Sequence, residues 1–250
     1  ENTGSNYPDL ETPTPIDAFV AMKLRKLGEV PSGLCSDGEF LRRASLDITG
    51  TLPTVAETEA FLSDTSPDKR NAKIEELLER PGYAAWWATK LCDWTGNNDR
   101  NQSNNGPEQR QGASRFWYDW MQQKVAENLP YDEIVRGIVL AKSRLDGESY
   151  EAYCERMSSY LAKGSDGSFA DQPYLPYFWT RQNFRKPEEQ ALGFAYTFLG
   201  VRIQCAQCHK HPFDQWTKDD FDRFKNFFTR VAYDRNGRNE QEAKAYRNML

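Results

Sequence analysis

The residues with the clearest chemistry are two cysteines and two histidines in one short stretch. Cys205 and Cys208 are separated by two residues, and His209 follows at once. Two thiols at this spacing can add across the two vinyl groups of one haem, and the next histidine can ligate the iron. One turn of helix would place both thiols on the same side. The stretch therefore predicts one covalent haem c, with His209 as the proximal iron ligand.

Two other chemistries use a Cys-x-x-Cys pair. Structural zinc normally takes four protein ligands, and His209 or His211 would supply only the third. The fourth would have to come from the remaining cysteines, which are Cys35, Cys92 and Cys154. A redox disulfide is the second alternative, although such a site usually opens a helix after a strand, and no alternation of strands and helices is found. A non-haem interaction module with zinc or a disulfide therefore stays open.

The ligand on the face of the iron opposite His209, if there is one, distinguishes two kinds of haem protein. His211 lies two residues from His209, so we expect it on the same side of the haem. Met121 or Met157 is the candidate sixth ligand, although each is also a natural core filler. A methionine ligand would suit electron transfer, whereas an open site would suit an enzyme acting on peroxide.

Residues just after the cysteines form a second group. Asp214 could orient His211, which would then buttress the turn or meet a haem propionate. A proton carrier and an ordinary surface histidine are the other interpretations of His211. Trp216 is predicted to pack on the haem or on the neighbouring helix.

Composition narrows the class of protein. The chain has 250 residues, of which 38% are hydrophobic, and no apolar run approaches the length of a membrane span. A net charge of −5 without a basic stripe argues against nucleic acid, and it is compatible with a basic redox partner. Catalytic triads, phosphate loops and carboxylate pairs are not discernible. No signal peptide is visible at Glu1, yet bacterial haem c is attached outside the cytoplasm, so we expect an exported, periplasmic or secreted protein.

Apolar periodicity predicts an all-α fold, an irregular multi-helix domain with long polar loops at 96–112 and 165–176. We expect a flexible arm at 1–13, a helical domain at 14–232 and a charged tail or linker at 233–250. Capping boxes predict four helix starts, at Thr14 with Asp17, Ser36 with Glu39, Thr54 with Glu57, and Thr217 with Asp220. A tryptophan-rich stretch is predicted to pack in the core through Trp86, Trp87, Leu91 and Trp94.

Three stretches together resemble a known family. They are residues 15–20, residues 41–54 with their Arg-Arg, Asp-Ile-Thr-Gly and Leu-Pro-Thr signatures, and residues 198–214, with a weaker match at 129–132. The chain is similar over residues 14–231 to the second of the cytochrome-like domains of large secreted planctomycete proteins, a family of unknown function. Thr51 departs from the family's usual turn. The resemblance implies an exported, mostly helical domain that another domain usually follows. We therefore predict a monohaem c-type cytochrome domain that exchanges electrons with a redox partner protein or a following domain.

Overall fold

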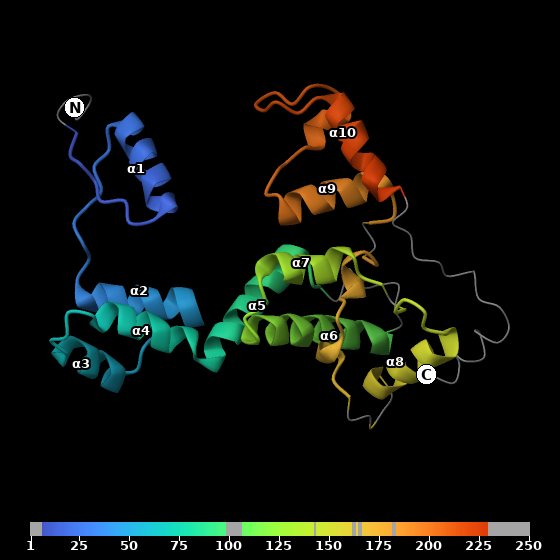
Figure 1. The fold of residues 1–250 in the computed structure, drawn as a ribbon, viewed down its shortest axis with the longest axis horizontal. Coiled ribbons are helices and arrows are strands. Elements are labelled where there is room, and N and C mark those ends of the chain that lie inside the picture. Colours follow the sequence, from blue (N-terminus) through green and yellow to red (C-terminus); the bar gives the residue numbers. More distant parts are fainter. Residues whose placement is uncertain are drawn as a thin grey trace. The chain divides into compact units, whose positions relative to one another are not determined.

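The computed structural model describes residues 7–98, 107–142, 144–161, 164, 167–181 and 184–229. Within these ranges every regular element is a helix, which confirms the all-α class (Figure 1). The α-helices are α1 (Pro15–Leu27), α2 (Asp37–Thr49), α3 (Val55–Ser63), α4 (Lys69–Leu78), α5 (Pro81–Thr95), α6 (Pro107–Ala126), α7 (Tyr131–Val139), α8 (Tyr150–Leu161), α9 (Pro187–Phe198) and α10 (Lys218–Lys225). Short 3₁₀ helices are η2 (Phe169–Asp171), η3 (Pro176–Phe178), η4 (Gln204–Gln207) and η5 (Asn226–Phe228).

Local sequence sets the helix starts, as the capping boxes predict. At α1, the Thr14 hydroxyl accepts the Asp17 N–H at 3.3 Å and the Asp17 carboxylate accepts the Thr14 N–H at 3.0 Å. The same reciprocal bonds occur at the starts of α2, α3 and α10. Gly28 ends α1 at φ 72°, a left-handed conformation that costs glycine little. All four predicted helix starts are confirmed.

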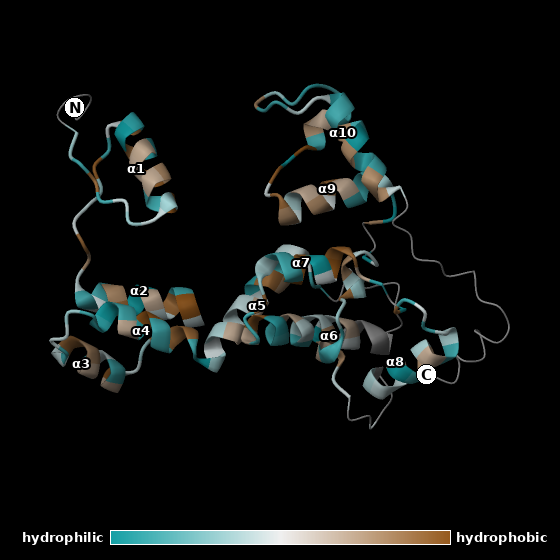
Figure 2. Cartoon of the chain, in the orientation of Figure 1, coloured by the Kyte–Doolittle hydropathy of each residue, from teal (hydrophilic) through white to brown (hydrophobic). Residues whose placement is uncertain are grey.

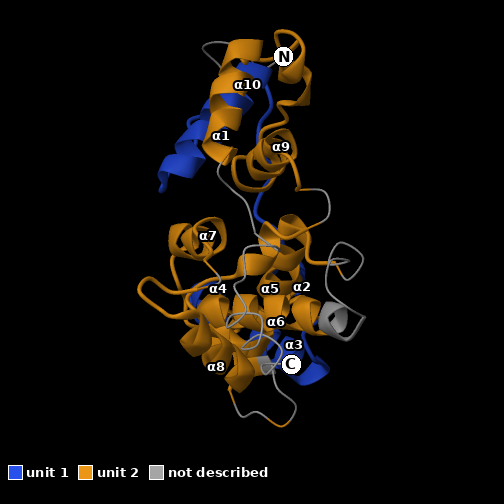
Figure 3. Cartoon of the chain, turned by 90° about the vertical axis from the view of Figure 1, so that its right-hand side faces the viewer, with its two compact units in different colours: residues 1–44, 52–73 blue, residues 45–51, 74–250 orange. Residues whose placement is uncertain are grey.

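The contacts along the chain divide it into two compact units (Figure 3). Unit 1 holds residues 1–44 and 52–73, and unit 2 holds residues 45–51 and 74–250. Helices α2 and α4 contribute residues to both units. The arm at 1–13 and the domain limits at 14–232 stay predictions, and the tail at 233–250 lies outside the described residues.

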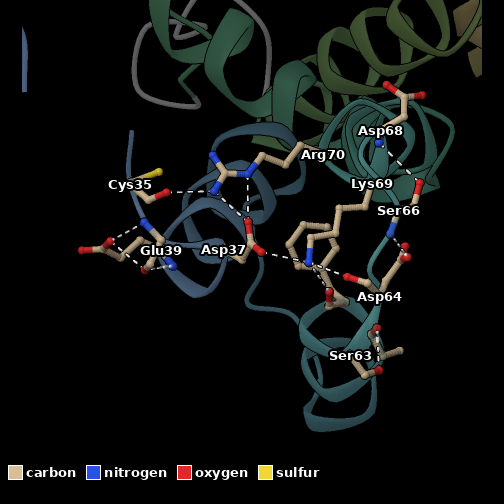
Figure 4. Close-up of polar contacts among 12 residues, drawn as sticks. Cys35, Asp37, Glu39, Ser63, Asp64, Ser66, Asp68, Lys69 and Arg70 are labelled. Carbon is tan, nitrogen blue, oxygen red and sulfur yellow. Dashed lines mark hydrogen bonds and ion pairs between the residues drawn. The ribbon is translucent and has the colours of Figure 1, made fainter. Parts of the chain in front are cut away.

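Unit 1 is tied together by a carboxylate that holds two cations (Figure 4). The carboxylate of Asp37, in the first turn of α2, accepts bonds from Lys69 at 2.8 Å and from Arg70 at 2.7 Å. Arg70 also donates to the carbonyl of Cys35 at 2.8 Å, and Lys69 donates to that of Phe61 at 3.2 Å. The bonds from Lys69 and then Arg70 hold the pKa of the Asp37 carboxyl below its usual value. One side chain therefore joins the start of α2 to the start of α4.

Unit 2 is built around aromatic side chains. Helices α5 and α6 pack against each other, and Trp117, Trp120 and Met121 on α6 are fully buried. The helices carry hydrophobic and hydrophilic residues together, as amphipathic elements do (Figure 2). Leu91 is buried as predicted, but Trp94 is 54% exposed. The prediction that Trp94 packs in the core is therefore wrong: it lies in the last turn of α5, where its ring makes an edge-to-face contact with that of Trp87, and about half of the residue is exposed.

One helix begins earlier in the chain than the sequence predicts. Helix α6 begins at Pro107, inside the stretch 96–112 that lacks apolar periodicity. Proline at the first helical position is favourable, because its fixed φ suits the helix and its missing N–H would have no partner there.

Within the described ranges, none of the helices combines the length and the apolar character that crossing a bilayer requires.

Candidate functional site

The Cys-x-x-Cys-His stretch, residues 205–209 (the motif segment), lies between α9 and α10 in unit 2. Helix α9 ends at Phe198, and the chain then forms the 3₁₀ turn η4. The N–H groups of Cys208 and His209 both donate to the carbonyl of Cys205 at 3.3 Å. Ala206 is fully buried beneath this turn and anchors it to the unit. The motif segment is therefore an ordered turn on a packed base, separate from the helix that precedes it.

Both motif cysteines are exposed, free thiols. In a 3₁₀ turn the side chains of residues i and i+3 eclipse each other, so Cys205 and Cys208 leave the turn on the same side. Cys92 and Cys154 are buried elsewhere in unit 2. Burial raises the pKa of the Cys92 thiol to about 12, which makes it unreactive. Among the cysteines of unit 2, the two in the motif segment are therefore the ones whose thiols solvent and reagents can reach.

The imidazole of His209 is held in one tautomer. Its Nδ1 lies 2.7 Å from the carbonyl oxygen of Lys210. A carbonyl oxygen can only accept, so Nδ1 must carry the proton in the neutral ring. The lone pair is then on Nε2, at the outer edge of an exposed side chain. Histidines that bind metals are usually fixed in this way, with one nitrogen donating to the protein and the other ligating.

The loop after the motif segment is closed by its own backbone. The His211 N–H donates to the carbonyl of Trp216 at 2.8 Å, and the Phe213 N–H donates to Nδ1 of His211 at 3.3 Å. The carboxylate of Asp214 accepts the Gln215 N–H at 2.7 Å. The Asp214 carboxylate therefore bonds to the loop backbone. Nδ1 of His211 already accepts the Phe213 N–H, so this nitrogen is not available to a carboxylate that would orient the ring.

An apolar cavity of about 80 Å³ lies beside the motif segment. Its walls come from both flanking helices, the connection between them and the motif segment itself: Ala195, Leu199, Val201, Ile203, Ala206, Trp216, Asp220, Phe221 and Phe224. The indole Nε1 of Trp216 is buried and has no hydrogen-bond partner among the described residues. Trp216 therefore packs next to the motif segment with one unused donor. Trp216 could be predicted as a neighbour because it lies close to the motif segment in the sequence. The aliphatic residues of the cavity walls could not, because no sequence pattern distinguishes them from other apolar residues.

The two candidate methionine ligands lie away from this cavity. Met121 is fully buried in the aromatic core of unit 2. Met157, on α8, has its sulfur 3.6 Å from the side-chain Nε2 of Gln172, which donates to it. Neither residue lines the cavity beside the motif segment. Either methionine would have to leave these contacts to reach an iron ligated by His209.

A polar network fixes the surroundings of Met157. The Glu148 carboxylate accepts two bonds from Arg156, at 2.7 and 2.9 Å, and one from the Leu145 N–H at 2.9 Å. Arg156 also donates to Gln172 at 2.6 Å. These bonds, led by those from Arg156, lower the pKa of Glu148 to about 2. The sequence did not indicate this pair, because eight residues separate its members and α8 starts between them.

The donor set fits a covalently attached haem. It combines two exposed thiols at the ends of one turn and an exposed imidazole whose free lone pair lies on Nε2 in the neutral ring. Among the described residues, no three or more histidine, cysteine, aspartate or glutamate side chains converge as a metal site.

Comparison with known proteins gives a family. The family model PSCyt2, described as "Protein of unknown function (DUF1549)", matches residues 15–233. The chain therefore belongs to the PSCyt2 family. No curated protein and no solved structure matches it. The family's name suggests a cytochrome-like role, and its description assigns no activity.

Proposed function

We propose that this chain is an exported monohaem c-type cytochrome domain. Cys205 and Cys208 hold the haem through thioether bonds, and His209 is the proximal iron ligand. The haem, when bound, supplies reversible one-electron oxidation and reduction. The domain passes electrons within a larger periplasmic or secreted assembly, to a redox partner protein or to a following domain of a longer chain.

The observation that carries the proposal is the state of His209. The bond from its Nδ1 to the Lys210 carbonyl leaves the free lone pair of the neutral ring on Nε2 without any bound metal. The ligand therefore needs no change of tautomer to bind iron, and the bond to the backbone carbonyl fixes the orientation of its ring. The exposed thiols beside it can be reached by the enzymes that attach haem.

Exposure also supports electron transfer as the role. Cys205, Cys208 and His209 are all exposed, so a group bound to them stays close to the protein surface. A partner protein can then approach the redox centre closely without opening the unit. His211 and Trp216 are proposed as neighbours of the haem, and Met121 or Met157 stays a prediction for the sixth ligand.

An absorption spectrum tests this proposal. The full chain, produced with an export signal and a haem c maturation system, is purified, acid-denatured and extracted with solvent. Haem bands that remain with the polypeptide support covalent attachment, and the double variant Cys205→Ser/Cys208→Ser should lose them. The variant Cys35→Ser is the matched control and should keep them. A colourless parent protein under these conditions would reject the cytochrome role and favour zinc or a disulfide.

A further inference from the structure

Two exposed aromatic side chains line one shallow hollow of unit 2. Trp94, in the last turn of α5, and Tyr131, the first residue of α7, are each 54% exposed. Residues of α5, α6, α7 and α9 form this hollow, among them the half-buried Val135, Thr197 and Phe198. Aromatic residues scattered singly over a surface are ordinary, but two that share one apolar hollow are typical of an interaction site.

The size of the hollow excludes a small-molecule ligand. Its volume is about 10 Å³, which is space for one water molecule at most. The occupant that fits is therefore a second protein surface, which covers the two rings from outside. Tryptophan and tyrosine are enriched among the residues that contribute most to binding at such interfaces.

The charges next to these rings are negative. Asp93 is the residue before Trp94, and it is exposed. Asp132 is the residue after Tyr131, and it is exposed as well. Within the described part of the chain, neither carboxylate forms an ion pair or a hydrogen bond. Carboxylates and the faces of aromatic rings both attract cations, so this surface favours a basic partner.

The basic side chains of the two helices are already engaged. On α5, the Nζ of Lys90 lies over the rings of Trp86 and Trp87, at 4.7 and 5.2 Å from their centres. On α7, the Nε of Arg136 lies 3.3 Å from the Glu133 carboxylate. Neither cation pairs with the two free carboxylates, which are therefore left for cations of another molecule.

The hollow lies close to the proposed redox site. Phe198, the last residue of α9, lines the hollow, and Leu199, the next residue, lines the apolar cavity beside the motif segment. The two places are thus separated by the thickness of one helix, about 10 Å. A protein that covers the hollow would bring its own redox centre close to a group held at Cys205 and Cys208.

We propose that a docking patch formed by Asp93, Trp94, Tyr131 and Asp132 binds the basic surface of a redox partner protein. Lysine or arginine side chains of the partner meet the carboxylates and the aromatic rings. The chain's net charge of −5 attracts such a partner at longer range, which makes association fast and dependent on ionic strength. This inference rests on the proposed function for the partner's redox character, whereas the contacts themselves need no haem in this chain.

The first test removes the two charges. The probe is a small basic c-type cytochrome with lysines around its haem edge, and its binding to the full chain is measured by calorimetry at low ionic strength. We expect Asp93→Asn/Asp132→Asn to weaken binding roughly tenfold. The control Glu151→Gln/Glu155→Gln removes the same charge from exposed residues of α8 and should bind like the parent. Equal affinities in the two double variants would overturn the inference.

The second test removes one ring. Tyr131→Ala should also weaken binding of the probe roughly tenfold, because it removes an aromatic anchor from the hollow. Its control is Tyr196→Ala, since Tyr196 is 55% exposed and does not line the hollow. A Tyr131→Ala variant that binds as tightly as this control would contradict the docking patch.

Cross-linking locates the contact directly. A carbodiimide joins carboxylates to lysine amines that touch them, so the complex should yield cross-linked peptides that contain Asp93 or Asp132. Cross-links confined to other carboxylates would overturn the inference. So would a parent dimer in sedimentation that Tyr131→Ala abolishes, because a second copy would then occupy the patch.

The inference and the proposed function fail separately. A parent chain that carries covalent haem but does not bind the probe would overturn the docking patch alone. A parent chain that binds the probe through Asp93 and Asp132 but takes up no haem would support the docking patch as a site for basic proteins and reject the cytochrome role.

Discussion

Replacing Glu148 by glutamine should destabilise unit 2 at neutral pH. The side chain is 11% exposed, and its carboxylate receives two bonds from Arg156 and one from the backbone of Leu145. The pKa of about 2, against the ordinary 4.5, corresponds to an upper limit of about 3 kcal/mol. Residual solvent contact reduces this limit, and bonds to charged groups contribute about 1.5–3 kcal/mol. We therefore expect Glu148→Gln to cost about 2 kcal/mol.

Tryptophan fluorescence isolates the unit that carries the change. All seven tryptophans lie within residues 74–250, so their emission during urea denaturation reports on unit 2 alone. Glu155→Gln is the matched control, because Glu155 is an exposed residue of the same helix, α8. A loss below about 0.5 kcal/mol in Glu148→Gln, or a loss equal to that of the control, would show that the bonds between Glu148 and Arg156 do not stabilise the fold as described.

The same pair gives a pH dependence with a defined sign. The folded pKa of Glu148 lies below the unfolded value, so its contribution is complete above pH 4.5. The contribution then falls as the pH drops from 4.5 toward about 2. Parent and Glu148→Gln should therefore differ in free energy of unfolding at pH 7 and converge near pH 2. A difference that stays constant over this range would contradict the assigned cause.

Three further changes test other parts of the fold. Gly50→Ala should lower the free energy of unfolding by about 3 kcal/mol, because φ is +71° and the new Cβ would lie 2.5 Å from the Trp86 ring. Its control is Gly147→Ala, at φ +78° with nothing near the new Cβ, which should cost only about 1 kcal/mol in the same urea titration. Phe221→Ala, which removes a buried ring beside the apolar cavity, should cost about 3 kcal/mol, and a loss below about 1 kcal/mol would show that this ring is not packed as described. Asp37→Asn should speed hydrogen exchange in α2 and α4 at pH 7 but not at strongly acidic pH. The pKa of Asp37 is lowered in the folded state, so the carboxylate's contribution to stability is lost as the pH falls through that folded pKa. An equal effect at both pH values would contradict this assignment.

Helix starts could be predicted from sequence because their signals are local. A capping box needs only two residues three positions apart, as at Thr14 with Asp17, and its bonds form wherever the helix is placed. The motif segment is equally local, so the side on which Cys205 and Cys208 lie follows from one turn of backbone. Those features did not depend on how the remaining chain packs.

The cavity could not be predicted, because its walls meet only in the folded unit. Ala195 and Phe221 lie 26 residues apart, on α9 and α10, and neither has a distinctive neighbourhood in the sequence. The exposure of Trp94 was missed for the same reason, since helical spacing gives a residue's face but not what covers it. The partners of Asp214 and Met157 likewise depend on loop conformation, which periodicity does not report.

The mass of the motif peptide tests the cytochrome assignment most directly. Protein matured for haem c is denatured, digested and examined by mass spectrometry for the peptide that contains Cys205, Cys208 and His209. We expect this peptide to carry the mass of one haem, retained after denaturation and absent in Cys205→Ser/Cys208→Ser. Recovery of the peptide from matured protein with two unmodified thiols or an internal disulfide would contradict it.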